Sequence, residues 1–340
     1  MKDLLLKLTE GKNLTETEAF DAILTIMKNE AEPSLTGAFL TALSIKGETP
    51  TEIIGASRAM MEVAEIIDPG YDVLDIVGTG GDRSFSFNIS SVSAIVSASC
   101  GVKVAKHGNR SVSSKCGSGD LFDALGVKFD FASKHAKEVL DKAGMVFLYA
   151  PVYHKAMRFV GPIRKALGIK TIYNIMGPLI NPMNAKYMVL GVYKKELVRP
   201  VAEALKGKGL KGAMVVYGLD GVDELSVAAN TYVAEFRDGS KIDEYELNPE
   251  DYGIKLSKHE DLVGGEPEIN KQIALDILNG KKGPKRDVVV LNSACALHIY
   301  KGISIKDAIK EVENAIDTKK SLETLNKLIE VTNDIRWDCK

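Results

Sequence analysis

The spacing of apolar residues divides the chain into an N-terminal helical segment and a longer segment in which strands and helices alternate. Before residue 72 the apolar positions recur at helical spacing, as Phe20, Ile23, Leu24 and Met27 do. From there on, short apolar runs of strand type are separated by helical patterns, and the C-terminal part returns to helices. This alternation favours an α/β fold with a mainly parallel central sheet covered on both faces.

The change of pattern also predicts two domains. We expect a small all-helical N-terminal domain over residues 1–70 and a larger α/β domain over residues 71–340. Helices near residues 153–185 could pack with the first of these domains.

Local signals define the ends of several elements. Thr15 and Glu18 have the spacing of a capping box, as do Thr49 and Glu52, with Pro50 at the first helical position. Strands are expected in YDVLDIV, VKVAKHG, MVFLYA, YMVLGVY and GAMVVYG. The segment TYVAEFRDGSKIDEYEL predicts a hairpin that turns at its Asp-Gly pair.

Composition and charge exclude several classes of protein. The 340 residues are 45% hydrophobic and 26% charged with a net charge of −2, so bulk attraction to nucleic acid or to an anionic membrane is not indicated. No apolar run is long enough for a transmembrane helix, and the N-terminus lacks a signal-peptide pattern. None of the four cysteines forms a CxxC pair, which argues against a zinc or redox site. We therefore expect a cytoplasmic protein with no membrane or nucleic-acid partner.

A glycine-rich turn follows the first expected strand, in the stretch DIVGTGGDRSFSFNISS. Its glycines allow backbone N–H groups to approach a ligand closely, and a helix starting near Asn88 would point its positive end at the same space. Arg83 stands where a dinucleotide-binding loop needs glycine, and the Gly-Lys-Ser/Thr of a P-loop does not follow. The stretch therefore indicates an anion site of another kind. The alternative is a tight strand-to-helix turn capped by Asn88.

A second polar cluster, KHGNRSVSSKCGSGD, follows the next expected strand. Lys106 and Arg110 supply positive charge, and His107 and Asn109 supply directional hydrogen bonds. With serines at positions 111, 113, 114 and 118, the run suits a diphosphate and a sugar. The alternative is a solvated loop in which Ser118 caps the next helix.

A third cluster, GLDGVDELS, contains two adjacent carboxylates at a strand end. Asp223 and Glu224 are hard oxygen ligands and suit Mg²⁺ carried by phosphates. Adjacent acids are also common on protein surfaces, which is the alternative interpretation.

The fourth cluster lies in the segment 150–182. Arg164 could fork onto a carboxylate, and the alternative is a surface arginine on a helix. Gly177-Pro178 and Asn181-Pro182 predict rigid turns. No catalytic role is assigned to the histidines at positions 135, 154, 259 and 298, which are expected to bond locally or to be solvated.

Taken together, these clusters resemble the anthranilate phosphoribosyltransferase family. The segments GTGGD…FNISS, AKHGNRSVSS…GSGD, NIMGPLINP and DGVDELS occur in the family's order and spacing, and the likeness extends over essentially the whole chain. It implies a fold of the nucleoside phosphorylase/phosphoribosyltransferase type. It also implies Mg²⁺-dependent transfer of the 5-phosphoribosyl group from 5-phospho-α-D-ribose 1-diphosphate (phosphoribosyl diphosphate) to the amine of anthranilate, a step of tryptophan biosynthesis. Members are typically homodimers that associate through the helical domain.

The resemblance also implies which residues form the site. Lys106, Asp223 and Glu224 would be catalytic, and Mg²⁺ would be bound by Ser90, Asp223 and Glu224. Arg83 departs from the glycine usual in the family. The residues implied for anthranilate are Gly78, Asn109 and Arg164. The residues implied for phosphoribosyl diphosphate are Gly78, Gly81, Asp82, Ser86, Asn88, Ile89, Ser90, Ser91, Lys106, His107, Gly108, Asn109, Arg110, Ser111, Val112, Ser113, Ser114 and Ser118.

Two rival functions are less consistent with these motifs. A pyrimidine nucleoside phosphorylase shares the fold class but carries a Lys-His-Ser-Thr-Gly-Gly type of phosphate loop, whereas Lys106-His107 here leads into Gly-Asn-Arg. A non-catalytic, nucleic-acid-binding relative should have a basic surface and eroded metal positions. The near-neutral charge and the intact Asp223-Glu224 pair speak against it.

Overall fold

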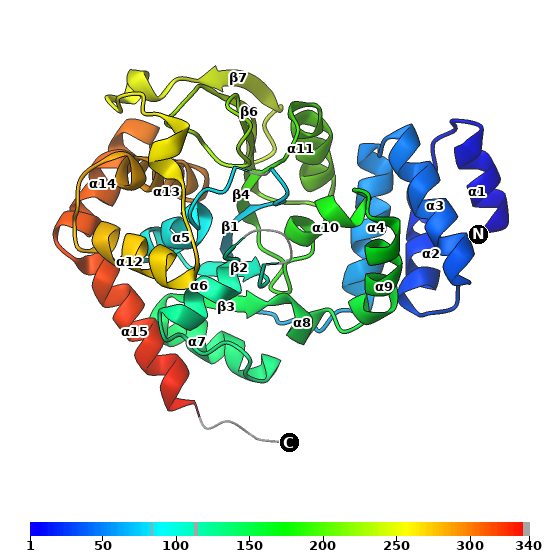
Figure 1. The fold of residues 1–340 in the computed structure, drawn as a ribbon, viewed down its shortest axis with the longest axis horizontal. Coiled ribbons are helices and arrows are strands. Elements are labelled where there is room, and N and C mark those ends of the chain that lie inside the picture. Colours follow the sequence, from blue (N-terminus) through cyan, green and yellow to red (C-terminus); the bar gives the residue numbers. More distant parts are fainter. Residues whose placement is uncertain (83, 112–114, 336–340) are drawn as a thin grey trace.

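The computed structural model describes residues 1–82, 84–111 and 115–335 (Figure 1). Arg83 therefore lies outside the described residues. So do Val112, Ser113 and Ser114, which are predicted to contact phosphoribosyl diphosphate.

The N-terminal segment folds into helices, as its apolar spacing predicts. Both predicted capping boxes form, because the hydroxyl of Thr15 accepts from the Glu18 N–H at 3.2 Å and that of Thr49 accepts from the Glu52 N–H at 3.3 Å. Each glutamate in return accepts from the N–H of its threonine at 2.8 Å. The helices are α1 (Lys2–Thr9), α2 (Glu16–Met27), α3 (Pro33–Lys46) and α4 (Pro50–Glu62).

One seven-stranded sheet forms the centre of the remaining chain, in the order β3-β2-β1-β4-β5-β6-β7. Strands β1 to β5 run parallel, and β6 and β7 add antiparallel at one edge. The predicted hairpin joins β6 to β7, with Asp238 at φ 49° and Gly239 at φ 79°. The strands are β1 (Leu74–Gly78), β2 (Val104–Gly108), β3 (Met145–Tyr149), β4 (Tyr187–Gly191), β5 (Gly212–Gly218), β6 (Thr231–Arg237) and β7 (Asp243–Leu247).

Helices lie on both faces of this sheet, which confirms the predicted fold class (Figure 1). No single described helix is long and apolar enough to cross a membrane; α13 and α14 would pass only as a pair, with a bend of 119° between them. The α-helices are α5 (Ile89–Ser99), α6 (Ser118–Ala124), α7 (Ala136–Ala143), α8 (Ala150–Tyr153), α9 (Met157–Leu167), α10 (Tyr173–Leu179), α11 (Val198–Gly207), α12 (Pro267–Leu278), α13 (Pro284–Lys301), α14 (Ile305–Asp317) and α15 (Lys320–Asp334). Short 3₁₀ helices are η1 (Ser133–His135), η2 (Lys195–Leu197), η3 (Pro249–Tyr252) and η4 (His259–Leu262).

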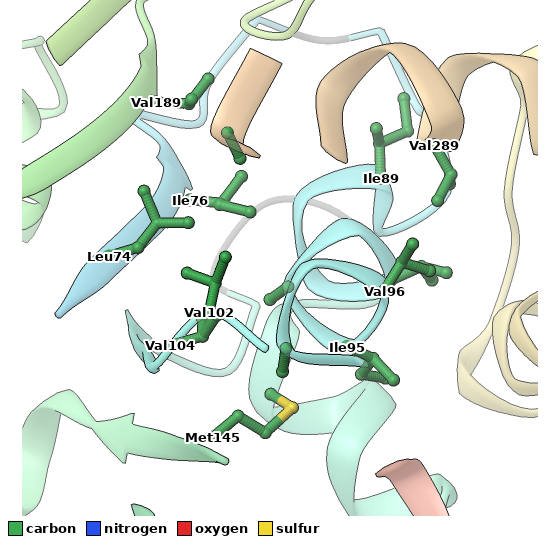
Figure 2. Packing of buried hydrophobic residues seen from close by; sticks show 14 of the residues in the cluster. Leu74, Ile76, Ile89, Ile95, Val96, Val102, Val104, Met145, Val189 and Val289 are labelled. Carbon is green, nitrogen blue, oxygen red and sulfur yellow. The ribbon is translucent and has the colours of Figure 1, made fainter. Parts of the chain in front are cut away.

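Alternate residues of the central strands face two separate cores. In β4, Tyr187 and Val189 join the core that contains α5 and α13, whereas Met188 and Leu190 join the core that contains α4 and α11. Figure 2 shows the first core, in which α5 lies beside the strands and near Val289 of α13. Because both faces of the strands are buried, a polar side chain within a strand, such as Asp75 of β1 or Lys106 of β2, needs a buried partner.

Helices α9 and α10 belong to the same core as the N-terminal helices. Helix α9 contacts α2 and α3, and α10 contacts α4. Val160 of α9 and Ile175 of α10 are fully buried together with Leu40 of α3 and Ile53 of α4. This core continues onto β4 and α11, so apolar packing runs from the helical segment to the sheet. The domain boundary at residue 70 stays a prediction.

Replacing Glu52 with Ala is expected to destabilise the helical segment by about 3 kcal/mol, because Glu52 is a fully buried carboxylate paired with Lys46. Its oxygens accept from the N–H groups of Leu14 and Thr49 and from Lys46 Nζ at 2.8 to 2.9 Å. Urea unfolding measures the loss. The matched control is Glu18→Ala, since Glu18 closes the other capping box at a partly exposed position and should cost about 1 kcal/mol. Equal losses in the two variants would contradict this account.

Candidate active site

The carboxyl ends of β1 and β4 lie against a loop that carries the predicted acid pair. This acid loop, residues 219–226, meets the glycine loop, residues 79–82 and 84–88, where the Gly80 N–H donates to Asp223 Oδ2 at 2.6 Å. A Cβ on Gly78 would lie 2.4 Å from Asp223 Oδ2, and a Cβ on Gly191 would lie 1.5 Å from the Asp223 carbonyl oxygen. Both strands therefore end in glycine because the acid loop occupies the space of a side chain.

The adjacent carboxylates of Asp223 and Glu224 repel each other; Asp223 is buried and Glu224 is half-buried. Burial, and after it the charge of Asp82, raises the pKa of Asp223 to about 7. Burial, and after it the charge of Asp223, raises the pKa of Glu224 well above its usual range. The Ser90 N–H binds Glu224 and opposes this shift. A divalent cation would relieve the repulsion, so the pair suits a metal ion.

The donor set fits Mg²⁺ bound together with a phosphate ligand. Among the described residues, no group of three or more His, Cys, Asp and Glu side chains could hold a metal ion by itself. The carboxylates of Asp223 and Glu224 and the hydroxyl of Ser90 are oxygen donors, which Mg²⁺ prefers. Phosphate oxygens and water would complete the six ligands that Mg²⁺ demands.

Lys106 lies beneath these loops, with 1% of its surface exposed. Its Nζ donates to the Ile76 carbonyl oxygen at 2.7 Å and to Ser90 Oγ at 3.3 Å. Burial lowers the pKa of Lys106, and the nearby carboxylates of Asp75 and Glu224 act in the opposite direction. Lys106 therefore brings a buried positive charge to Ser90, the predicted metal ligand.

The Asp75 carboxylate supports this lysine from inside the sheet. Burial raises the pKa of Asp75 to about 6, and Lys106 opposes that shift. Asn181 Nδ2 donates to Asp75 Oδ2 at 2.8 Å and to the Ala105 carbonyl oxygen at 2.7 Å. Asn181 thus ties β1 to β2, a role that its interpretation as part of a turn did not include.

The glycine loop leads into α5 without a side-chain cap. Asn88 occupies the N-cap position, but its Nδ2 donates to the Cys116 carbonyl oxygen at 3.0 Å and its Oδ1 accepts from Asn270 at 2.9 Å. Asn88 is thus the N-cap by position, as the alternative interpretation predicts, but its side chain does not cap the helix. Helix α5 directs its N-terminal amides and the positive end of its dipole at the site, where the Ser90 amide meets Glu224.

The alternative for the second polar cluster is wrong about the helix cap, although Asn109 and Arg110 are exposed as a solvated loop would require. Helix α6 begins at Ser118 with Gly117 as its N-cap, so Ser118 is not the cap. Asp120 holds the turn, because its Oδ2 accepts from the N–H groups of Gly117 and Ser111 at 2.8 Å. Arg110 pairs with Asp120 at 3.2 Å, so part of its charge is neutralised within this cluster.

All three residues predicted for anthranilate line one cavity of about 590 Å³. Gly78 and Asn109 belong to its wall at the strand ends, and Arg164 reaches it from α9. The Arg164 guanidinium lies 5.7 Å from the centre of the Tyr173 ring, and burial lowers its pKa. Gly177 and Pro178 add to the wall, but they lie inside α10 and do not form the predicted turn. A partly desolvated cation in a pocket of this kind favours a carboxylate ligand.

His107 and His154 line the same cavity, with ring centres 5.1 Å apart. Burial lowers the pKa of His107 to about 3 and that of His154 to about 4, so both rings are neutral at neutral pH. His107 Nδ1 lies 3.0 Å from the Gly177 carbonyl oxygen. The sequence predicts no catalytic role for His154, and the structure places it in the wall of the cavity. One feature of the sequence points to a place for His154 in the site: it lies in the same segment, 150–182, as Arg164.

Comparisons with known proteins define the class of the chain. The helical bundle domain of a glycosyl transferase family matches residues 2–64, and the a/b domain of such a family matches residues 70–322. The anthranilate phosphoribosyltransferase of Acetivibrio thermocellus is 50% identical, over 98% of this chain and 97% of that protein. The enzyme of Methanobrevibacter smithii is 48% identical, over 98% of this chain and 99% of that protein.

Comparison with solved structures leads to the same family. The anthranilate phosphoribosyltransferase of Thermus thermophilus superposes with a TM-score of 0.92 at 38% identity, covering 97% of this chain and 99% of that one. The Saccharomyces cerevisiae enzyme in complex with PRPP (phosphoribosyl diphosphate) and Mg gives 0.87 at 29% identity, covering 98% and 99%. The chain belongs to the anthranilate phosphoribosyltransferase family, which confirms the predicted resemblance. The relatives and structures named above are all anthranilate phosphoribosyltransferases, which favours this function over both rivals.

Proposed function

We propose that the chain transfers the 5-phosphoribosyl group of phosphoribosyl diphosphate to the amine of anthranilate, giving N-(5-phosphoribosyl)anthranilate and diphosphate. The observation that carries this proposal is that Gly78 borders both the buried Asp223 and the cavity that holds Arg164. Saccharomyces cerevisiae anthranilate phosphoribosyltransferase has been solved with PRPP and Mg and with 4-fluoroanthranilate, which supports both substrates and the cofactor.

The two polar loops would bind the diphosphate. The N–H groups of the glycine loop and of the first turn of α5 would donate to phosphate oxygens. Mg²⁺, held by Ser90, Asp223 and Glu224, would supply positive charge against that of the diphosphate. Lys106, fixed beneath Ser90, would stabilise the negative charge that develops as the bond from C1 of the ribose to the diphosphate oxygen breaks.

The cavity would hold anthranilate, with its carboxylate on Arg164. As the diphosphate leaves, C1 gains oxocarbenium character, the C1–N bond forms, and the amine then loses one proton to water or to diphosphate. A neutral aromatic amine is already nucleophilic, so positioning matters more than a strong base. The neutral rings of His107 and His154 suit such a wall, because they add no charge beside the amine.

The intrinsic fluorescence of anthranilate tests this function. With phosphoribosyl diphosphate, Mg²⁺ and the protein, we expect the fluorescence of anthranilate to fall with time, in proportion to protein concentration. Omitting Mg²⁺ should slow the fall strongly. A constant signal at all reasonable protein concentrations would refute the proposal.

Arg164→Ala is expected to raise the KM for anthranilate by about 10-fold or more, because a charge-assisted hydrogen bond is lost. The KM for phosphoribosyl diphosphate should change much less. Steady-state kinetics with each substrate varied in turn measures both constants. Lys165→Ala is the control, because Lys165 is an exposed cation on the same helix. A larger effect on phosphoribosyl diphosphate would count against the assigned role.

We further infer that two copies associate through the helical segment and that the protein is cytoplasmic. An apolar groove of about 1020 Å³ supports the homodimer; it is lined by α1, α3 and α9 and includes Ile45, of which 82% is exposed. Light scattering should give the mass of two chains, and Ile45→Asp should shift it toward one. A monomeric wild-type protein would refute this part.

A further inference from the structure

A short segment outside the sheet forms backbone hydrogen bonds with the glycine loop. This segment, residues 257–265, is called the strap. Its backbone pairs with the glycine loop, because the Phe87 N–H donates to the Leu262 carbonyl oxygen at 3.1 Å and the Gly264 N–H donates to the Phe85 carbonyl oxygen at 2.9 Å. At the start of the strap, the Ser257 N–H donates to the carbonyl oxygen of Val227, the residue that follows the acid loop, at 2.9 Å. The strap therefore bonds to the glycine loop and to the residue that follows the acid loop.

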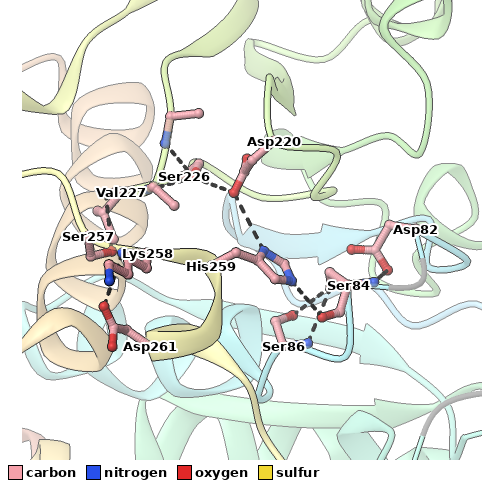
Figure 3. Close-up of polar contacts among 12 residues, drawn as sticks. Asp82, Ser84, Ser86, Asp220, Ser226, Val227, Ser257, Lys258, His259 and Asp261 are labelled. Atoms are coloured by element: carbon pink, nitrogen blue, oxygen red, sulfur yellow. Dashed lines mark hydrogen bonds and ion pairs between the residues drawn. The ribbon is translucent and has the colours of Figure 1, made fainter.

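One side chain of the strap lies between the two loops, hydrogen-bonded to the glycine loop and at ion-pair distance from the acid loop. The ring of His259 lies between them, with Nε2 at 2.9 Å from the Ser84 carbonyl oxygen and Nδ1 at 3.8 Å from Asp220 Oδ2 (Figure 3). Asp220 Oδ2 also accepts from Ser226 Oγ at 2.9 Å, which fixes the carboxylate within the acid loop. The His259 side chain is 35% exposed and that of Asp220 is 14% exposed, so the link lies at the margin of the site.

The two ring nitrogens of His259 have different roles in these contacts. A carbonyl oxygen only accepts, so Nε2 carries the hydrogen in the contact with Ser84. Nδ1 lies 3.8 Å from Asp220 Oδ2, beyond hydrogen-bond distance, so this contact is an ion pair only when the ring is protonated. Asp220 stands three residues before Asp223, the predicted metal ligand. Asp82 connects the same two loops from the other side, since its oxygens lie 3.4 Å from the Ser84 N and 3.5 Å from the Asp223 N.

We propose that His259 is a positioning residue that holds the glycine loop and the acid loop in register and so sets the affinity for phosphoribosyl diphosphate. This rests on the proposed function, because both loops are assigned to that substrate. His259 is not among the described residues that line the cavity assigned to anthranilate. Its effect should therefore be selective for one substrate.

Two variants of the full chain test this. His259→Leu removes both contacts and should raise the KM for phosphoribosyl diphosphate about fivefold, on the scale of one lost hydrogen bond. The KM for anthranilate and kcat should stay near wild type. His259→Gln keeps an N–H donor that can reach the Ser84 oxygen and should recover most of the affinity. His135→Leu is the control, because the His135 side chain is 22% exposed and lies on another element.

Hydrogen exchange without substrates gives an independent readout. The Phe87 and Gly264 amides should exchange faster in His259→Leu than in wild type or in His259→Gln. Unchanged exchange, an unchanged KM, or equal rises for both substrates without recovery in His259→Gln would overturn the proposal. If the wild-type protein does not consume anthranilate, the proposed function fails, whereas the exchange rates still decide whether His259 holds the loops.

Discussion

The double variant Asp223→Asn, Glu224→Gln is expected to lower Mg²⁺-dependent turnover by at least about 10²-fold, because charge stabilisation at a reacting group is commonly worth that much. Each amide keeps the size of the carboxylate and one carbonyl oxygen. The Gly80 N–H can therefore still be satisfied, and the fold should be retained. The variant loses both negative charges that a divalent cation needs at this buried position. The effect should thus appear in the metal dependence and not only in the maximal rate.

Initial rates of anthranilate consumption over a series of MgCl₂ concentrations measure this effect. The half-saturating Mg²⁺ concentration should rise together with the loss of rate. Glu250→Gln, Asp251→Asn is a matched control, because these two acids are also adjacent but lie exposed on η3. The control should keep the wild-type metal dependence. An unchanged dependence in the Asp223 and Glu224 variant would place the metal elsewhere.

Most of the fold could be predicted from the sequence because its signals are local. The capping boxes at Thr15 and Thr49 act within one helical turn, and the Asp238-Gly239 turn needs only two residues with positive φ. The strands of the parallel sheet are mostly apolar, since both faces are buried, with Asp75 in β1 and Lys106 in β2 as exceptions that belong to the site. The strand order, in which β1 lies between β2 and β4, cannot be predicted from local patterns.

The site was predicted less completely, because its arrangement depends on contacts between distant residues. Asn88 and Ser118 have the residue type and position of helix caps, yet Asn88 bonds to Cys116 and Asn270, and Gly117 takes the cap position before Ser118. The pairing of Lys106 with Ser90, and the link from His259 to Ser84 and Asp220, likewise join separate segments. Residue types at strand ends predicted the chemistry, whereas the partners required the fold.

Gly191 is a residue whose importance follows from a contact with a distant residue and not from its neighbours in the sequence. Within the sequence it is a glycine in the predicted strand YMVLGVY, and nothing there indicates a function. In the structure it pairs in register with Gly78 across β1 and β4, and its carbonyl oxygen accepts from the Thr79 N–H at 2.9 Å. A Cβ at this position would lie 1.5 Å from the Asp223 carbonyl oxygen, a separation that no side chain can adopt. Gly191 thus determines where the acid loop can lie.

Gly191→Ala is therefore expected to lower kcat/KM by about 10²-fold, since a displacement of roughly 1 Å in a positioned group can cost this much. The φ angle of Gly191 is not positive, so the added methyl acts through the displaced Asp223 backbone and not through strain at residue 191. Steady-state kinetics at saturating Mg²⁺ measures the loss, and thermal unfolding monitors the fold.

Gly212→Ala separates a loss of activity from a loss of stability. Gly212 begins β5 at the opposite end of the sheet, where an added Cβ would lie 3.2 Å from Tyr187 Cδ1. This variant should lose some stability and keep its turnover, because the crowded atom belongs to a core side chain remote from the acid loop. If Gly191→Ala instead turned over like wild type, the acid loop would tolerate displacement. The proposed dependence of turnover on the position of Asp223 would then be wrong.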